Sequence, residues 1–599
     1  MALNLNFQQE ISKIIAQATK LSEEEVESLI TIPPDSKLGD YAFPCFKLGK
    51  NPKEEAEKLK NQMYEKLKNN IKSLNYIKKT EVVGPYLNFF LSSSVFAEYT
   101  LSKIYAEASF YGRQDIGKGK KIIVDFSSPN IAKPFGIGHL RSTVIGNSLY
   151  NVFNYLGYES FGVNHLGDWG TQFGKLIVAY NKWGDEKGLE NEPIKYLLEL
   201  YVKFHKQAEK DEVLNDEARA EFKKLEDGDK GAVIQWELFR KISLEEFQRI
   251  YHILNVKFDS YNGEAFYNHL LDKTIEQLKE KVKTKISDGA LIIDLEKYKM
   301  PPILLKKSNG STTYHTRDLA AAYYRLQKYR PEKVLYVVGS PQKMHFEQLF
   351  KVLELVGVND SKSVDKNKSV DKNKVADKKK GINESKFVHV DFGHFSFPEG
   401  KMSTRSGNII FLEEVLDKAI TLAEKTIEQK NPSLENKKEV ALMVGVGAII
   451  FADLSNDRNR NITFDWDRML SFDGETAPYL QYTHARACSI IRKSFRDEKI
   501  SVLDKVNFNK FNLDEEMAVI RWLYDFPNVI VRVAESYKPH HLAHYLISLA
   551  QAFNEFYHKC PVISDDKDLM KARLLLVDAV KQVLDNGLGL LGIKAPNEM

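Results

Sequence analysis

The chain has 599 residues, of which 43% are hydrophobic and 28% are charged, a balance typical of globular proteins with several domains. Its net charge is +4, and residues 359–386 account for the whole excess with nine Lys against five Asp and Glu. The overall charge is therefore too small to indicate a nucleic-acid partner. Evidence for such a partner must come from local sites.

Residues 1–110 have the pattern of a small α/β domain. Apolar residues at helical spacing occupy 11–15 and 56–67, and the turn-forming stretch PPDSKLGDYAFP lies between them at 33–44. The apolar run YLNFFL at 86–91 predicts a strand. A polar, glycine-containing stretch follows at 111–120 and predicts a linker.

Residues 111–430 alternate strand-like and helix-like segments. The run KIIVDF at 121–126 precedes a helical pattern, and similar units occupy 160–170, 312–326 and 333–342. This alternation predicts an α/β fold with a doubly wound, Rossmann-like parallel sheet. Charged helical patterns at about 180–280 predict a helical insertion. Residues 359–386 contain a degraded six-residue repeat and predict a disordered loop, with a basic RNA tether as the alternative.

Residues 431–599 have a helical pattern throughout. The run ALMVGVGAIIFADL at 441–454 is too short to span a membrane, so we expect a buried helix and no membrane partner. Leu, Tyr and Phe recur at i, i+3 and i+4 between residues 542 and 556, which predicts another core-facing helix. We therefore expect a C-terminal domain composed of helices.

The stretch GIGH at 136–139 lies between the strand ending at Phe126 and a helix. A helix N-terminus offers free N–H groups to a phosphate, and Gly136 and Gly138 let a ligand approach the backbone. His139 can donate a hydrogen bond to a phosphate oxygen. The alternative is a glycine-rich turn with a packed histidine, and a motif this short does not decide between them.

A second polar stretch, FPEGKMSTRSGN at 397–408, carries Lys401 and Arg405 between two glycines. Cations placed near a developing phosphate charge stabilise a transition state. A solvated surface turn is the alternative interpretation.

These stretches carry a family resemblance. GIGH resembles the HIGH signature of class I aminoacyl-tRNA synthetases, and KMSTR at 401–405 resembles their KMSKS loop. The segments SSPNIAKP, NHLGDWGTQFG, TYHTRDLA, YVVGSPQKMHFEQLF and PYLQYTHARACSI resemble arginyl-tRNA synthetases in particular. The resemblance covers nearly the whole chain apart from 359–386.

The resemblance implies site residues for each substrate. Arginine would contact Asp125, Ser128, Pro129, Asn130, His139, Tyr314, Asp318 and Gln342. ATP would contact Gly136, Gly138, His139, Lys401, Met402 and Ser403, and the catalytic groups would be Lys133, His139, Lys401, Ser403 and Arg405. The chemistry agrees, because a guanidinium has five donors and needs a carboxylate and fixed acceptors. Asp318 supplies that carboxylate, and Asp125 would hold either the α-amino group or the guanidinium.

Two positions depart from the family signatures. Gly136 replaces the first His of HIGH, and Thr404 replaces the second Lys of KMSKS. Lys133 is placed to supply a compensating cation. The departures motivate an alternative, a catalytically weakened tRNA-binding or scaffold protein of the same fold.

The resemblance also implies contacts with arginine tRNA. The N-terminal domain would contact the tRNA elbow, with Tyr41 and Phe43 as candidates. The C-terminal bundle resembles the family's anticodon-binding domain, although VDAV at 577–580 departs from its DALR letters. Its candidates are Tyr479, Gln481, Tyr482, His484 and Arg486, because unstacked bases bind aromatic and cationic side chains. The simpler alternative is that these aromatic residues belong to the core.

The expected activity is ligation of L-arginine to its tRNA through an arginyl-adenylate, with ATP and accompanying Mg²⁺ and with bound tRNA required for activation. We expect domains at 1–110, 111–430 and 431–599. Three widely spaced cysteines and an N-terminus without a signal-peptide pattern indicate the cytoplasm. We favour a monomer and expect no protein-bound metal, because His540, His541 and His544 lack the further ligands of a zinc site.

Overall fold

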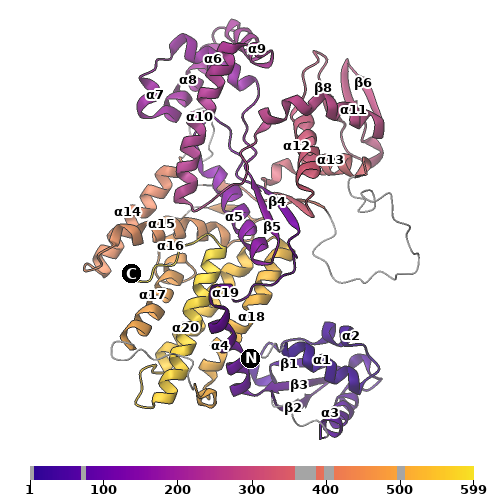
Figure 1. The fold of residues 1–599 in the computed structure, drawn as a ribbon, viewed down its shortest axis with the longest axis vertical. Helices are drawn as coiled ribbons and strands as arrows, with labels where there is room; N and C mark the ends of the chain where they lie inside the picture. The colour runs from indigo at the N-terminus through magenta and orange to yellow at the C-terminus, as the bar shows by residue number, and fades with distance from the viewer. Residues whose placement is uncertain (1–5, 69–75, 358–385, 397–410, 464, 495–505) are drawn as a thin grey trace. The chain divides into compact units, whose positions relative to one another are not determined.

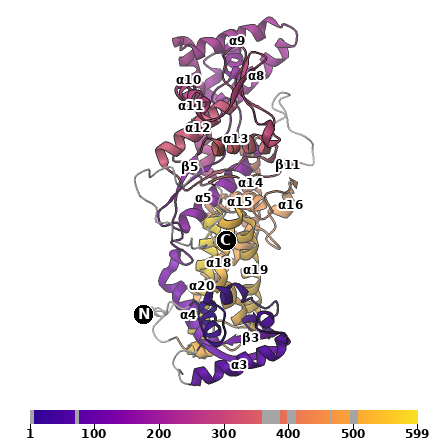
Figure 2. The same ribbon diagram turned by 90° about the vertical axis from the view of Figure 1, so that its right-hand side faces the viewer.

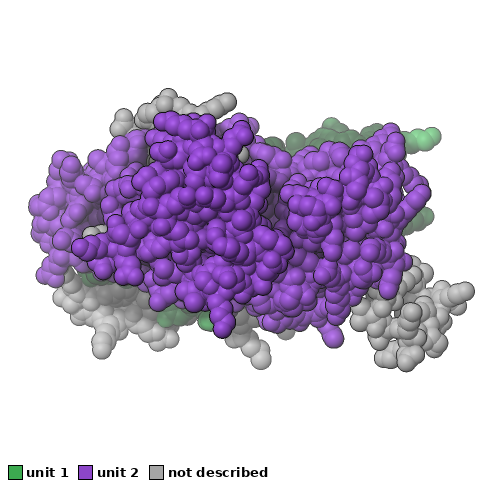
Figure 3. All heavy atoms as spheres, turned by 90° about the horizontal axis from the view of Figure 1, so that it is seen from above, with its two compact units in different colours: residues 1–111, 483–526, 548–586 green, residues 112–482, 527–547, 587–599 purple. Residues whose placement is uncertain are grey.

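The computed structural model describes residues 6–68, 76–357, 386–396, 411–463, 465–494 and 506–599. These residues form two compact units, which Figure 3 distinguishes by colour. The first unit comprises 1–111, 483–526 and 548–586, and the second comprises 112–482, 527–547 and 587–599. Each is described by itself below.

The N-terminal part of the first unit is an antiparallel sheet of three strands in the order β1–β3–β2 with helices packed on it (Figure 1). Phe89 of β3 and Phe7 of α1 are fully buried between sheet and helices. The elements are α1 (Phe7–Ala18), α2 (Glu23–Leu29), β1 (Tyr41–Pro44), α3 (Pro52–Lys68), β2 (Ile77–Val83), β3 (Tyr86–Leu91) and α4 (Ser93–Glu107).

The second unit contains the predicted parallel sheet. Its strands run in the order β10–β9–β4–β5, and all three pairings are parallel. The strands are β4 (Lys121–Asp125), β5 (Glu159–Val163), β9 (Lys333–Tyr336) and β10 (Phe387–His389). Helix α5 (Leu140–Tyr155) lies so close to β4 that a Cβ at Gly146 would fall 2.3 Å from the Phe126 side chain. Only glycine fits there, which fixes the helix against the strand.

Helices and a small antiparallel sheet interrupt the parallel strands (Figures 1 and 2). The helices after β5 are α6 (Thr171–Trp183), α7 (Gly188–Asn191), α8 (Pro193–Ala208), α9 (Val213–Glu226), α10 (Lys230–Ile253) and α11 (Leu271–Lys281). The small sheet contains β6 (Thr284–Ser287), β7 (Ala290–Ile293) and β8 (Ile303–Lys306). Helices α12 (Tyr314–Tyr329) and α13 (Lys343–Leu355) flank β9 in sequence.

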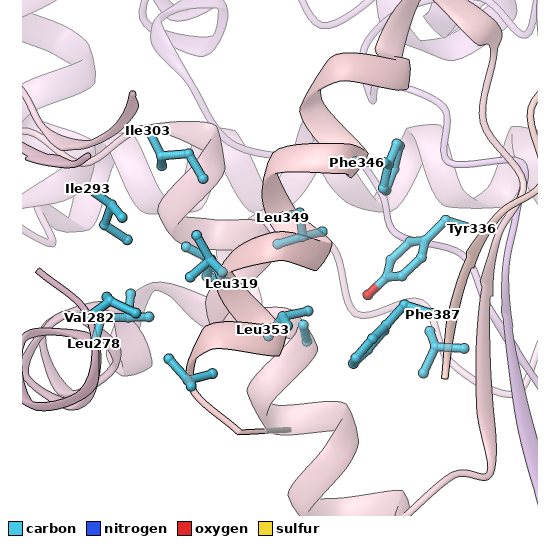
Figure 4. Packing of buried hydrophobic residues seen from close by; sticks show 14 of the residues in the cluster. Leu278, Val282, Ile293, Ile303, Leu319, Tyr336, Phe346, Leu349, Leu353 and Phe387 are labelled. Carbon is cyan, nitrogen blue, oxygen red and sulfur yellow. The ribbon is translucent and has the colours of Figure 1, made fainter. Parts of the chain in front are cut away.

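A continuous core joins this small sheet to the parallel sheet. Figure 4 shows Leu319 of α12 and Leu349 of α13 lying between Ile293 of the small sheet and Tyr336 and Phe387 of the parallel strands. All five side chains are buried. Helix α12 therefore packs between the two sheets. This packing fixes the position of the residues at its N-terminal end.

The chain after residue 411 is mainly helical, as the sequence predicts. The helices are α14 (Leu412–Lys430), α15 (Lys437–Leu454), α16 (Trp466–Met469), α17 (Ala477–Ser494), α18 (Asp514–Ser536), α19 (His540–Lys559) and α20 (Lys567–Leu590). The two-residue strands β11 (Phe395–Ser396) and β12 (Ile462–Thr463) pair in parallel. The apolar run at 441–454 lies in α15, which is largely buried. Among the described residues, none of the helices combines the length and apolar character that crossing a membrane requires.

Arg141, in the first turn of α5, connects that helix to α15 and to the segments that flank β11 and β12. Its side chain is 1% exposed and pairs with the equally buried Asp453 at 3.1 Å. The guanidinium also donates to the carbonyl oxygens of Gly393, Arg458 and Arg460 at 2.7 to 3.2 Å. All its donors on Nη1 and Nε therefore have partners inside the unit, as a buried guanidinium requires.

Replacing Asp453 with Ala is expected to lower the free energy of unfolding of the second unit by about 3–5 kcal/mol, because it leaves a buried guanidinium without its counter-charge. Urea titration followed by tryptophan fluorescence measures this, since Trp169, Trp183, Trp236 and Trp466 lie in this unit. The matched control is Asp227→Ala, which removes an exposed pair with Lys223 and should cost less than about 1 kcal/mol. Equal effects of the two substitutions would contradict this account.

Candidate active site

The loops that follow β4, β5 and β9 meet at the carboxyl edge of the parallel sheet, the usual ligand position in such folds. Ser142 of α5 ties two of these loops together. Its hydroxyl oxygen accepts from the Ser127 N–H at 2.8 Å and donates to the Val337 carbonyl at 2.6 Å. The N-terminal turn of α5 is thereby fixed against the ends of both β4 and β9.

GIGH forms a short 3-10 turn, Ile137–His139, that leads directly into α5. Among the described residues, nothing lies within 4 Å of where a Cβ on Gly138 would be, so the packing of the fold does not demand this glycine. The backbone here faces open space at a helix N-terminus. That arrangement can hold a phosphate.

His139 is neutral in this structure. The pKa of His139 is lowered to about 4, mainly by burial and also by the positive charge of Lys133, while the hydrogen bond with the Gly136 backbone opposes this shift. The Nδ1 atom lies 3.2 Å from the Gly136 carbonyl, which can only accept, so Nδ1 carries the proton and Nε2 is an acceptor. Donation from Nε2 to a phosphate requires the ring to take up a second proton.

Lys133, proposed to compensate for the lysine that Thr404 replaces, lies in the loop before α5. The Lys133 ammonium stands 5.2 Å from the centroid of the Tyr201 ring on α8, at cation–π distance. Its charge therefore lies near the loop but is directed toward the helical insertion.

The predicted loop residues Lys401, Met402, Ser403 and Arg405 lie outside the described residues. Where the description resumes, Phe411 forms a backbone bridge with Gly136, and the Leu412 N–H donates to the Phe135 carbonyl at 2.9 Å. The chain that follows KMSTR is thus attached directly to the GIGH loop.

Asp125, the last residue of β4, is 4% exposed and engaged within the protein. The buried Arg325 of α12 donates to Asp125 Oδ2 at 2.6 Å, and the Ser128 hydroxyl donates to Oδ1 at 3.1 Å. Burial disfavours the charged form of Arg325, but contact with Asp125 raises the pKa of Arg325 well above the ordinary range. Arg325 also lies 3.3 Å from His165 Nδ1, in the loop after β5.

Asp318 lies on the same helix as Arg325 but presents a partly open carboxylate, 27% exposed. His345 Nε2 lies 2.7 Å from Oδ2, and His165 Nε2 lies 3.6 Å from Oδ1. Burial favours the neutral acid, but the hydrogen bond from His345, with the charges nearby, holds the pKa of Asp318 below its usual value. An anionic carboxylate therefore faces the site.

Aromatic rings flank this carboxylate. Tyr314, one turn before Asp318, is 55% exposed, and its ring stacks on His315 with centroids 4.1 Å apart. The His345 ring lies 5.2 Å from that of Tyr314. Gln342, exposed in the turn before α13, completes the residues that the sequence assigned to the guanidinium.

The remaining predicted residues are Pro129 and Asn130, which lie beside the loop after β5. The Gly167 N–H donates to the Pro129 carbonyl at 3.0 Å, and Asn130 forms a backbone bridge with Gly167. Direct contacts connect Ser128, Asp125, Arg325, His165, Asp318 and His345 in one continuous chain of polar side chains. Sequence reasoning did not single out His165, Arg325 or His345. Only the motif letters around the two histidines carried a signal for them.

Four of the predicted tRNA-binding residues are in the core rather than on the surface. Tyr41 and Phe43 of β1 are 6% and 0% exposed, because they are part of the sheet's apolar packing. Gln481 and His484 are 0% and 3% exposed. The Gln481 amide donates to the carbonyls of Met443 and Lys594 at 3.0 and 2.8 Å, which is a structural role.

The other anticodon-domain candidates reach the surface to different degrees. Tyr482 is 40% exposed, and Tyr479 and Arg486 are half-buried. Arg486 donates to Asn554 at 2.6 Å and stands 5.5 Å from the Tyr557 ring centroid. In the N-terminal part, the exposed aromatic pair is instead Phe46 and Tyr86, 57% and 38% exposed, with ring centroids 5.9 Å apart.

Comparison with protein families matches three models along the chain. Residues 100–466 match the catalytic domain of class I tRNA synthetases of the arginine type, which is more than half of the chain. Residues 480–599 match the DALR anticodon-binding domain, and residues 5–91 match the arginyl-tRNA synthetase N-terminal domain.

Full-length relatives give the same result. The chain is 46% identical to an arginine–tRNA ligase of Halothermothrix orenii over 596 residues, which is 99% of this chain and 100% of the relative. It is also 46% identical to one of Clostridioides difficile over 579 residues, 97% of each chain. Among solved structures, the arginyl-tRNA synthetase of Thermus thermophilus superposes with a TM-score of 0.80 at 25% identity, covering 99% of this chain and 100% of that one.

We expect His139 to remain neutral from about pH 5.5 upward in the substrate-free protein, because burial lowers its pKa to about 4. Two-bond ¹H–¹⁵N spectra of histidine-labelled protein, with His139→Asn to assign the signal, measure the state of each ring nitrogen. The signal should show Nδ1 protonated and Nε2 unprotonated across this range. A charge change of this ring between about pH 5.5 and 7.5 would contradict the assignment.

Proposed function

The chain belongs to the class I arginyl-tRNA synthetases and ligates arginine to tRNA with ATP, and on this premise we propose that Asp318 binds the substrate guanidinium at the carboxyl edge of the parallel sheet. One observation carries the proposal. Asp318 is a partly open carboxylate that contacts imidazoles, whereas Asp125 at the same edge is neutralised by Arg325. A cation entering the site is attracted to the carboxylate whose charge is still available.

The surroundings of Asp318 suit a planar cation. A guanidinium forms paired hydrogen bonds with a carboxylate and stacks on aromatic faces, and Tyr314 offers such a face one helical turn away. Gln342 supplies a further acceptor. Asp125 has both oxygens engaged, so we propose that it orders Arg325 and Ser128 and does not touch arginine.

In the chemical step, an oxygen of the arginine carboxylate attacks the α-phosphorus of ATP, and the bond to pyrophosphate breaks. A terminal hydroxyl of the tRNA then attacks the carbonyl carbon, and AMP leaves. The protein contributes positioning and charge stabilisation. ATP enters as its magnesium complex, with its phosphates at Gly138 and the N-terminus of α5.

His139 takes up a proton as the triphosphate binds and then donates from Nε2 to a phosphate oxygen, since its Nδ1 is committed to the Gly136 carbonyl. Lys401 and Arg405 supply permanent charges, with Ser403 and Met402 in the same loop. Lys133 is the further cation on the side of the helical insertion.

For tRNA, we propose that the exposed pair Phe46 and Tyr86 takes the role that the sequence gave to Tyr41 and Phe43. Tyr479, Tyr482 and Arg486 remain the candidates in the C-terminal helices. We further propose domains at 1–110, 111–430 and 431–599, action as a monomer, and location in the cytoplasm, where the three buried cysteines, which form no disulfide, stay reduced.

The alternative of a weakened scaffold protein rested on Gly136 and Thr404. The full-length arginine–tRNA ligases at 46% identity favour catalysis instead. The contacts of Gly136 with His139 and Phe411 use backbone atoms alone. A histidine at 136 is therefore not needed for the local structure.

The decisive experiment is ATP–pyrophosphate exchange over the standard amino acids, with and without arginine tRNA. Of the standard amino acids, we expect only arginine to support exchange, and only when tRNA is present. Asp318→Asn should raise KM for arginine about 100-fold or more, because a charged partner of the guanidinium is lost, with KM for ATP nearly unchanged.

The matched control is Asp272→Asn, which alters a carboxylate that is 87% exposed on α11 and should leave every constant unchanged. Exchange with a different amino acid, or an unchanged KM for arginine in Asp318→Asn, would refute the assignment.

A second expectation concerns tRNA. Phe46→Ala and Tyr86→Ala should each raise KM for tRNA about 5- to 100-fold in aminoacylation, since a stacked base contributes about 1–3 kcal/mol. KM for arginine and ATP should stay constant. Tyr105→Ala, at a tyrosine 40% exposed on α4, is the control, and a similar effect of all three substitutions would argue against a specific stacking site.

A further inference from the structure

His345 occupies a constrained position beside the proposed guanidinium site. It is the third residue of α13, its side chain is 9% exposed, and its Nε2 lies 2.7 Å from Asp318 Oδ2. Its ring is packed against those of His315, Phe346 and Tyr314, with centroids 4.9 to 5.2 Å away. The imidazole therefore has little freedom to turn away from the carboxylate.

The hydrogen-bond partners determine the state of this ring. Among the described residues, the buried Nδ1 of His345 has no hydrogen-bond partner, whereas Nε2 faces a carboxylate oxygen, which accepts. A proton consequently lies on Nε2, which donates it to Asp318 Oδ2.

His165 supports the same conclusion from the other side of Asp318. The guanidinium of Arg325 can only donate, so His165 Nδ1, at 3.3 Å, accepts from it and Nε2 carries the proton. That Nε2 stands 3.6 Å from Asp318 Oδ1, beyond hydrogen-bond distance. Oδ1 is therefore the carboxylate oxygen less committed to the protein.

Two carboxylates near this edge, Asp125 and Asp168, have different partners from Asp318. Asp125 pairs with Arg325 and Asp168 pairs with Arg240, so each negative charge is cancelled by a cation of the chain. Asp318 instead contacts two imidazoles, through one hydrogen bond from His345 and a longer contact with His165. A single imidazole N–H fixes the carboxylate and leaves its other lone pairs open to a guanidinium.

We propose that His345 is a positioning residue for arginine specificity, which orients the Asp318 carboxylate through one hydrogen bond and leaves Oδ1 and the remaining lone pair of Oδ2 to the substrate. The proposal rests on the proposed function of Asp318. His345 itself does not touch arginine.

Two substitutions separate this role from simple packing. In His345→Gln the side-chain amide can place a donor where Nε2 lies, whereas in His345→Asn the shorter amide reaches only the position of Nδ1. We expect His345→Asn to raise KM for arginine at least about tenfold in tRNA-dependent pyrophosphate exchange, because a charge-assisted hydrogen bond is lost. Both kcat and KM for ATP should change less than about threefold, and His345→Gln should stay within about threefold of the unmodified protein.

A double-mutant cycle with Asp318→Asn tests whether His345 acts through that carboxylate. In the Asp318→Asn background, His345→Asn should change KM for arginine less than about twofold. Multiplicative effects, or a loss in kcat with KM unchanged, would overturn the proposal. So would a His345→Gln variant that is as impaired as His345→Asn.

The outcomes also distinguish this proposal from the one on which it rests. If Asp318→Asn alone leaves KM for arginine unchanged, the guanidinium site is wrong and this inference is overturned with it. If Asp318→Asn has its expected effect but the cycle shows no coupling, only the role of His345 is overturned. Should His345→Asn not fold, a tenfold increase in KM for His345→Gln is sufficient to overturn the proposal.

Discussion

The buried ion pair between Arg325 and Asp125 sets the geometry on which the rest of the site depends. It joins α12 to the end of β4, 200 residues earlier in the chain, with a distance of 2.6 Å. Tyr314, Asp318 and Arg325 recur at i, i+4 and i+11 and therefore share one face of α12. Anchoring Arg325 at the sheet edge necessarily turns Asp318 and Tyr314 toward that edge, where we propose that arginine binds.

Helix α5 provides the second constraint, because its first turn contacts both the loops at the sheet edge and helix α15. Its N-terminus follows GIGH, Ser142 holds the loops after β4 and β9, and Gly146 allows contact with Phe126. Arg141 fastens the same turn to Asp453 of α15. A buried ion pair therefore links α15 directly to the helix whose N-terminus we propose as the phosphate site.

The fold could be predicted from sequence because apolar runs and helical periodicity report local structure directly, and the parallel sheet follows from their alternation. The motifs likewise placed Asp318 and His139 in the site. Burial of Tyr41, Phe43, Gln481 and His484 could not be predicted, since an aromatic or polar residue on a helix or strand has the same letter whether it faces tRNA or the core. Arg325 was missed for a related reason. Its partner lies 200 residues away, and no local pattern identifies a buried guanidinium.

With glycine at position 136, the proposed phosphate site has one histidine fewer than the family signature. The Gly136 carbonyl holds His139 Nδ1, and burial keeps the ring neutral in the absence of substrate. The GIGH loop therefore offers backbone N–H groups and a helix terminus but no permanent charge. In the proposed function, Lys401, Arg405 and Lys133 supply the permanent positive charge, and His139 becomes charged only when the phosphates bind. An imidazole that is protonated only when the triphosphate is bound stabilises that complex without attracting other anions to the empty site.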